Sequence, residues 1–151
     1  MAATFYLAGA LQQSGKSSEA LAIYRQLASS RPDDVDALND FAYMLCETGG
    51  NLDEALKSAQ RAVQKAPERP GITDTLAWVY FKKGTTDIAV RLFGNVVQKD
   101  PENATFRYHL GAALLQKGDK EKARAELQTA LSKKPQPAEE KKIRELLAGI
   151  S

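Results

Sequence analysis

The stretch LAWVYFKKGTTDIAVRLFGNVVQKDP, residues 76–101, decides the fold of this chain. Its landmarks return through the sequence at steps of 34 or 35 residues. Four independent positions follow this period, and an internal repeat of about 34 residues outweighs any local motif. The repeated positions are Ala8, Ala42, Ala77 and Gly111; Gly15, Gly50, Gly84 and Gly118; Ala20, Ala55, Ala89 and Ala123; and Pro32, Pro67, Pro101 and Pro135.

Each repeat is predicted to contain two helices that are joined at a glycine and ended by a proline. Within residues 73–80, the side chains of one face recur at i, i+3, i+4 and i+7, which is the spacing of a helix. Gly84 then supplies the backbone freedom that a helix C-terminus commonly needs. A second stripe runs through residues 89–97 and stops before Pro101, because proline cannot continue a helix. The other repeats follow the same order, which predicts eight helices.

Polar residues stand where these helices are expected to begin, and their side chains can cap the helix N-termini. Pro70 suits a first helical position, where its missing N–H is not needed. The second repeat is one residue longer than the others, and the expansion falls at Gly49-Gly50, in the turn. The expected caps are Asp34, Asn51, Thr85, Asn103 and Asp119.

Small residues at the eighth and twentieth positions of each repeat allow two antiparallel helices to approach closely. After the fourth repeat, Ile143, Leu146, Leu147 and Ile150 form one apolar edge of a charged segment. A solenoid has to cover its last exposed face, so we expect residues 138–149 to form a ninth, capping helix. The alternative role for this edge is to bind a partner.

The period and the landmarks resemble the tetratricopeptide repeat (TPR), a helix–turn–helix unit of 34 residues. The third repeat matches the family pattern best, although Thr73 stands where tryptophan is usual. The second repeat departs most, because Ala59 takes the place of a phenylalanine. Residues 52–55 and 74–80 also look like repeats of long bacterial proteins of this family.

The resemblance implies an all-α fold, an α-solenoid with a right-handed superhelical course and a C-terminal capping helix. It predicts one TPR domain over residues 1–151, with repeats at about 1–34, 35–69, 70–103 and 104–137. In such a fold the first helices of the repeats line a concave groove. The family typically binds a peptide segment or a helix of another protein in this groove.

The predicted groove residues lie at positions two, five, nine and twelve of the repeats, on one side of each first helix. Aromatic side chains beside Asn and Asp suit peptide recognition, because rings bury much area at low entropic cost. The alternative is that the rings pack between adjacent first helices, and for Tyr43 and Trp78 both interpretations stay open. The groove residues are Phe5, Asn39, Tyr43, Asp74, Trp78, Phe81, Tyr108 and Leu115.

Catalytic and metal-binding functions have little support in the residues. His109 is the only histidine and Cys46 the only cysteine, which excludes metal sites built on several histidines or thiols. The glycines end helices and form no phosphate-binding loop. One TPR subclass grips a C-terminal carboxylate with a lysine clamp, and the corresponding positions here hold no lysine or arginine. We expect no enzyme activity, no metal and no cofactor.

The amino-acid composition limits which classes of partner and which cellular compartments are consistent with the sequence. A net charge of +2 is too small to indicate nucleic-acid binding, although residues 104–151 hold ten Lys and Arg against six Asp and Glu. No apolar run reaches the roughly 20 residues of a membrane helix, and no signal peptide is visible. Because the first repeat begins almost at Met1, we expect the chain to be a piece of a longer protein. The cytoplasm and a bacterial cell envelope both stay open.

These observations predict a scaffold or adaptor that binds a peptide or helix of a partner protein in the concave groove. The alternative is a structural spacer or a self-association segment of a longer TPR array. In that case the chain would form homo-oligomers through its exposed terminal helices.

Overall fold

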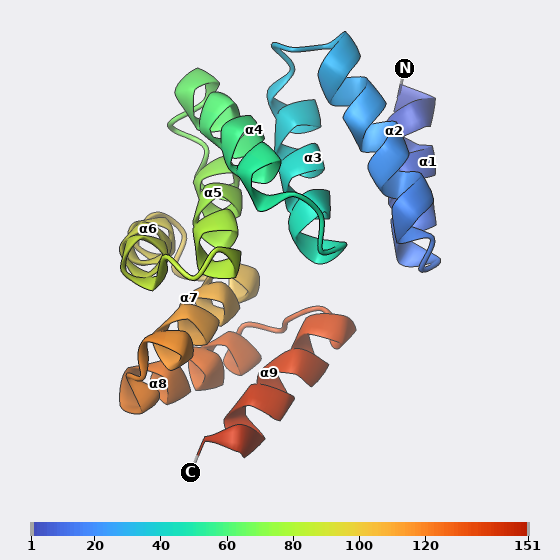
Figure 1. Ribbon diagram of the computed structural model, residues 1–151. Coiled ribbons are helices and arrows are strands. Elements are labelled where there is room, and N and C mark those ends of the chain that lie inside the picture. The colour runs from blue at the N-terminus through green and yellow to red at the C-terminus, as the bar shows by residue number, and fades with distance from the viewer. Residues whose placement is uncertain (1, 151) are drawn as a thin grey trace. The chain divides into compact units, whose positions relative to one another are not determined.

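The computed structural model describes residues 2–150, with side chains from Tyr6 onward. The described residues form nine α-helices and no strand, as the repeat pattern predicts (Figure 1). The helices are α1 (Ala2–Gln13), α2 (Ser17–Ser30), α3 (Val35–Glu47), α4 (Leu52–Lys65), α5 (Pro70–Lys82), α6 (Thr86–Lys99), α7 (Ala104–Lys117), α8 (Lys120–Ser132) and α9 (Pro137–Gly149).

The chain divides into two compact units, of which the first ends at Lys83 and contains α1 to α5. In this unit α1 packs against α2, and α3 packs against α4, as expected for the two helices of one repeat. Each new repeat continues the stack, because α2 contacts α3 and α4 contacts α5 (Figure 1). The first helices α3 and α5 also contact each other directly.

The second unit begins at Gly84 and contains α6 to α9. Here α7 packs against both α6 and α8, and α9 contacts α7 and α8. Ile143, on the inner side of α9, is fully buried. The terminal helix therefore covers the fourth repeat, which confirms its predicted position as a cap. The boundary between the units falls in the turn of the third repeat, so the single domain over residues 1–151 stays a prediction.

Four of the five expected side-chain caps are present. Pro70 is also confirmed in the first turn of α5. The expectation for Thr85 is wrong: it precedes α6, but its side chain makes no capping hydrogen bond. Its ψ of 66° is close to the 77° of Asp119, which does cap α8 with its side chain, so the backbone angle alone does not account for the difference. The caps accept backbone N–H groups as follows: Asp34 from Ala37, Asn51 from Asp53 and Glu54, Asn103 from Phe106, and Asp119 from Lys122.

The extra residue of the second repeat is Gly50, which corrects the alignment of the turn glycines. Gly49 has a φ of +67°, as Gly15, Gly84 and Gly118 have φ values between +79° and +94°. Gly49 is therefore the equivalent of the other turn glycines. Gly50 fills a different need, since a Cβ there would lie 2.7 Å from a methyl group of Leu45.

Small residues do stand where the paired helices meet. Ala8 and Ala20 in the first repeat, like Ala42 and Ala55 in the second, are fully buried. At the corresponding place in the fourth repeat, a Cβ on Gly111 would lie 2.7 Å from both Cγ and Cδ2 of Leu127. The fully buried Leu127 side chain therefore occupies the space that glycine leaves open on α7.

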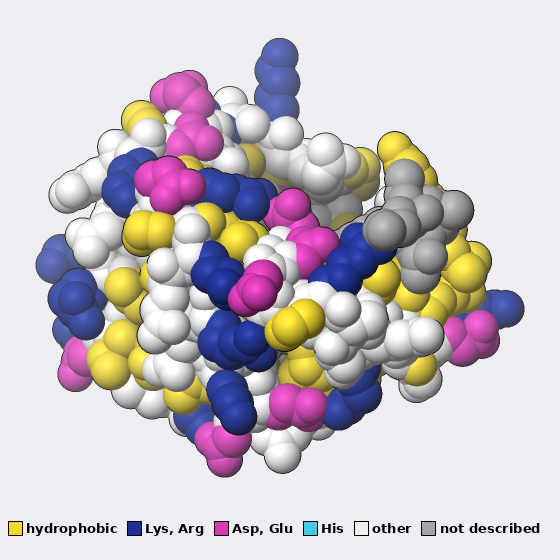
Figure 2. Space-filling model, turned by 90° about the horizontal axis from the view of Figure 1, so that it is seen from above, with side chains coloured by type: hydrophobic (Ala, Val, Ile, Leu, Met, Phe, Trp, Pro, Cys, Tyr) yellow, Lys and Arg dark blue, Asp and Glu magenta, His cyan; other side chains and the backbone are white. Residues whose placement is uncertain are grey.

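Ion pairs recur between successive repeats and follow the same period. Lys83 pairs with Asp53 in the first unit, and Lys117 pairs with Asp87 at the equivalent positions of the second unit. Lysines near the ends of α4 and α8 likewise contact carboxylates of the preceding repeat, at Asp33 and Glu102. On the face shown in Figure 2, cationic and acidic side chains lie next to one another. Exposed pairs of this kind add little stability, so the buried apolar contacts hold the fold.

The contact at Gly111 yields a test of helix packing with a matched control in the same unit. Gly111→Ala should lower the free energy of unfolding by about 1–2 kcal/mol, since overpacking against Leu127 outweighs the gain in helix propensity. Gly94→Ala, on α6, meets no atom within 4 Å and should raise stability by up to about 1 kcal/mol. Urea unfolding followed by circular dichroism measures both changes. Equal stabilisation by the two substitutions would contradict the tight contact between α7 and α8.

Candidate functional site

The predicted groove residues fall in both units of the chain. Asn39 and Tyr43 lie on α3, and Asp74, Trp78 and Phe81 lie on α5, so five of them share the surface of two contacting helices. Tyr108 and Leu115 lie on α7 in the second unit. The side chain of Phe5 lies outside the described residues. The main candidate site therefore lies on α3 and α5.

Trp78 is held in place from three directions. Its indole Nε1–H donates a hydrogen bond of 2.8 Å to Glu47 Oε1, at the end of α3. The Phe81 ring stacks on the indole with 4.8 Å between the ring centroids and 26° between the planes. The Lys82 ammonium lies 5.0 Å from the centre of the indole, within the range of a cation–π interaction. Trp78 exposes only 6% of its surface and thus links α5 to α3.

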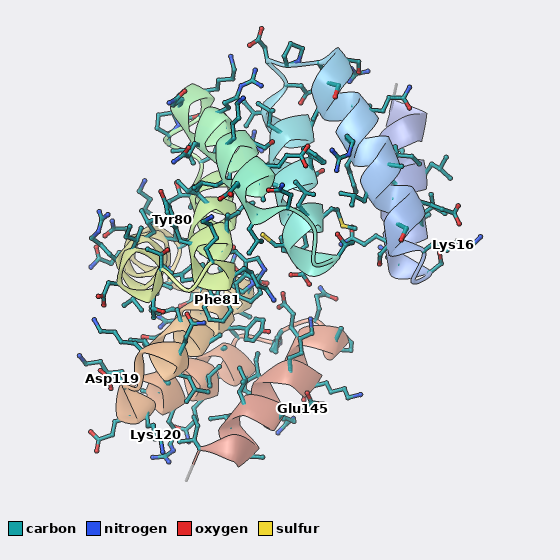
Figure 3. The ribbon with its side chains drawn as sticks, viewed as in Figure 1. Lys16, Tyr80, Phe81, Asp119, Lys120 and Glu145 are labelled. Carbon is teal, nitrogen blue, oxygen red and sulfur yellow. The ribbon has the colours of Figure 1, made fainter. Side chains whose placement is uncertain are left out.

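Of the predicted groove rings on α3 and α5, Tyr43 and Phe81 keep accessible surface, and both are half-buried. Asp74, one turn before Trp78, is buried and exposes 6%. Figure 3 labels Phe81 and its neighbour Tyr80 near the end of α5. The Tyr80 hydroxyl accepts a long hydrogen bond from Gln60 of α4, whereas Phe81 stacks on Trp78. Tyr80 therefore belongs to the scaffold, and Phe81 belongs to the surface of α3 and α5.

Asp40 is the carboxylate whose environment is most perturbed on α3. Burial raises its pKa from the ordinary 3.8 to about 6, and the nearby carboxylates of Asp36 and Asp34 add to the increase. The side-chain amide of Asn39 donates to Asp40 Oδ1 over 3.2 Å and opposes the shift. Ionisation of Asp40 at neutral pH therefore places a half-buried negative charge beside the candidate site.

The first helix of the fourth repeat presents a more closed surface. Tyr108 exposes 8% of its surface, and its ring lies 5.3 Å from that of His109. Thr105, at the start of α7, donates its hydroxyl hydrogen to the carboxylate of Glu139 on α9 over 2.9 Å. Leu115 is half-buried. The capping helix thus engages the beginning of α7 and leaves Leu115 as the more accessible of the two predicted residues.

The two residues that an enzyme hypothesis would need are both buried. Burial raises the pKa of the Cys46 thiol to about 12, and the neighbouring Glu47 carboxylate adds to this shift. A thiol with this pKa holds almost no thiolate at neutral pH, so it is a poor nucleophile. His109 exposes 4% of its surface and packs against Phe93, with ring centroids 5.6 Å apart. Within the described part of the chain, no three His, Cys, Asp or Glu side chains group into a metal site.

Glu47 and Lys82 contribute to the site but were not among the predicted residues. Glu47 lies 31 residues before Trp78, and this separation of nearly one repeat brings the end of α3 to the middle of α5. The signal was present in the sequence as an acidic residue at the end of the preceding first helix. This signal alone does not predict the hydrogen bond between Glu47 and Trp78. The period determines which helices are neighbours, but it does not determine which conformations their side chains adopt.

The repeat assignment is supported by comparison with known families. Two family models, both described as tetratricopeptide repeat, match residues 5–70 and 80–148. This chain belongs to the tetratricopeptide repeat family. The TPR repeat-containing protein PA4667 of Pseudomonas aeruginosa is one relative, and it is 28% identical over 87 residues. That match covers 58% of this TPR chain and 15% of the relative.

Solved structures agree with the fold. TTC0263, a thermophilic TPR protein of Thermus thermophilus, superimposes with a TM-score of 0.84 at 23% identity, covering 97% of this chain and 79% of that chain. MamA of Desulfovibrio magneticus RS-1, from residue 41 to its end, gives a TM-score of 0.70 at 20% identity and covers 97% and 81%. At these identities the likeness shows the TPR α-solenoid fold alone.

The raised pKa of Asp40 predicts a pH-dependent stability change in this TPR chain. The folded protein holds the proton more tightly than the unfolded chain, so the contribution of Asp40 is most favourable below about pH 4 and is lost as the pH rises through about 6. Asp40→Asn should therefore raise the unfolding free energy at about pH 8, by roughly 1–2 kcal/mol after allowing for solvent screening. The gain should disappear near pH 4.

Thermal unfolding across this pH range measures the effect. Glu68→Gln makes the same chemical change at an exposed carboxylate of the same unit and serves as the control. A gain from Asp40→Asn that is independent of pH would show that ionisation of Asp40 is not its cause.

Proposed function

We propose that this TPR chain is a scaffold that binds a peptide segment or a helix of a partner protein on the surface of α3 and α5. The TPR fold is in general a scaffold for protein–protein interaction, and its members are generally not enzymes. No helix among the described residues is long and apolar enough to cross a membrane.

The observation that carries the proposal is the fixed position of Phe81. Its ring is half-buried and stacks on Trp78, which Glu47 and Lys82 hold in place. A ring that is already immobilised loses little conformational entropy when a partner packs against it. Aromatic side chains with these properties dominate the binding energy at many interfaces. In this proposal Trp78 holds the Phe81 ring in position, and Phe81 contacts the partner.

Polar groups on α3 fit the same mode of binding. Tyr43 is half-buried and offers both an apolar ring and a hydroxyl group. One turn earlier, the enclosed Oδ1 of Asn39 accepts no hydrogen bond from the described residues. Tyr43 and Phe81 would then anchor side chains of the bound segment.

The test compares partner capture by the wild-type chain and by Tyr43→Ala with Phe81→Ala. Both rings are partly accessible, so their loss should remove most captured partner while the helicity measured by circular dichroism stays unchanged. Trp78 is left intact because truncating a buried side chain would confuse lost binding with lost stability. Retained proteins are identified and quantified by mass spectrometry.

The matched control is Tyr6→Ser with Leu7→Ser, which removes two exposed apolar side chains from α1. It should leave partner capture intact. Equal capture by the wild type and by the Tyr43 and Phe81 variant would contradict binding on α3 and α5.

Self-association through α1 is a second candidate function, favoured by one observation. Tyr6 and Leu7 expose 78% and 53% of their surfaces, whereas the residues equivalent to Leu7 in the later repeats are buried. In those repeats the second helix of the preceding repeat packs against the first helix. A second copy of the chain would cover Tyr6 and Leu7 in a similar way. The equivalents of Leu7 are Phe41, Leu76 and Leu110.

The two functions predict different results in solution. Self-association through α1 would give a dimer fraction that rises with concentration and is lost in the Tyr6→Ser, Leu7→Ser variant. Size-exclusion chromatography with light scattering measures this fraction. A monomer at every concentration would exclude self-association through α1 and leave partner binding on α3 and α5 as the proposed function.

A further inference from the structure

A hollow of about 290 Å³ lies between the second helices α2 and α4, over residues of α3 that the proposed partner site does not use. Leu38 and Phe41 of α3 form part of its lining and are almost completely buried. Ser58 of α4 donates its hydroxyl hydrogen to the Leu38 carbonyl oxygen over 2.8 Å. Ser29 of α2 and Lys57 of α4 are exposed and stand at the edge.

The hollow exists because Leu38 and Ser58 have shorter side chains than the residues at the equivalent positions of the fourth repeat. The internal repeat places Arg107 and Glu126 in the second unit at the positions equivalent to Leu38 and Ser58. Arg107 and Glu126 form an ion pair of 2.8 Å between α7 and α8, and both side chains are largely buried. Two long side chains thus occupy, in the fourth repeat, the place where Leu38 and Ser58 leave room. The second and fourth repeats therefore differ at this place.

Two arginines fix the walls of the hollow. Arg25 of α2 pairs with Glu54 of α4 over 2.7 Å, and its guanidinium lies 5.2 Å from the centre of the Phe41 ring. Arg61 of α4 donates from Nη2 to the carbonyl oxygen of Pro32, also over 2.7 Å. Side-chain bridges therefore connect α4 to α2 and to the loop before α3. An occupant would meet a preformed site, with a lower entropic cost of binding.

The charge around the hollow is positive, although the second repeat as a whole has a negative net charge. Residues 35–69 contain six Asp and Glu and four Lys and Arg. At the hollow, however, the carboxylates of Glu54 and Asp33 are already paired, with Arg25 and Lys65. Lys57 and Arg61, one turn apart on α4, add two further cations at its edge. The field at this site therefore favours an acidic ligand.

We propose that this hollow binds an acidic peptide segment of a partner, which inserts one large apolar side chain over Phe41 and Leu38. Carboxylates on either side of that side chain pair with Lys57 and Arg61. The volume suits one large side chain with its adjoining backbone, at the small end of ligand pockets. The apolar floor supplies affinity, and the two cations select acidic neighbours over basic ones.

The test uses a blocked peptide with one phenylalanine between two pairs of glutamates, titrated into the ¹⁵N-labelled full chain and followed by NMR. Amide shifts should cluster at Ser29, Lys57 and Ser58. Lys57→Glu with Arg61→Glu should weaken binding about tenfold or more, since two favourable charge contacts become repulsive. Ser29→Trp should weaken it as well, by placing a ring over the hollow from its exposed edge.

The matched control is Arg91→Glu with Lys99→Glu, the same charge change at exposed positions of α6, which should leave the affinity unchanged. A peptide with alanine in place of phenylalanine, and one with lysines in place of glutamates, should both bind more weakly. The proposal fails if no shifts occur, or if they centre on Tyr43 and Phe81. It also fails if the charge reversal at Lys57 and Arg61 has no effect, or if the alanine peptide binds equally well.

Discussion

The close contact between the two helices of a repeat, as in α1 with α2, α3 with α4 and α7 with α8, is the constraint on which the rest of the structure depends. Fully buried alanines at Ala8, Ala20, Ala42 and Ala55 allow this approach in the first two repeats. Gly111 does the same in the fourth, where Leu127 fills the space that a Cβ would need. Large side chains are thereby moved to the seams between repeats. These positions define the TPR fold and tell nothing about a partner.

The sequence predicted what depends on local chemistry or on the period. Asp34, Asn51, Asn103 and Asp119 cap the helices because each needs only its own side chain and the next turn of backbone. It did not distinguish Gly49 from Gly50, since both are glycines and only the packing of Leu45 assigns their roles. The site was harder to predict, because its contacts join residues about one repeat apart.

Trp78 illustrates this limit. Its position in the repeat predicted a place on the surface of the first helices, where binding and packing were both open. The structure shows that the indole packs, through Glu47, Lys82 and Phe81, and that Phe81 keeps accessible surface. These contacts depend on the side-chain conformations of neighbouring helices, which a repeat pattern does not contain. Small sequence differences between repeats also produce distinct surfaces, as Leu38 and Ser58 do between α2 and α4.

The most direct measurement is the fluorescence of Trp78, the only tryptophan, in the free protein and with a captured partner. We expect acrylamide to quench the indole poorly in the free protein, because Trp78 is buried and hydrogen-bonded. Partner binding should also change the emission spectrum, since the Phe81 ring proposed to make the contact stacks on the indole. An indole that is readily quenched in the free protein, or an emission spectrum indifferent to the partner, would contradict these roles of Trp78 and Phe81.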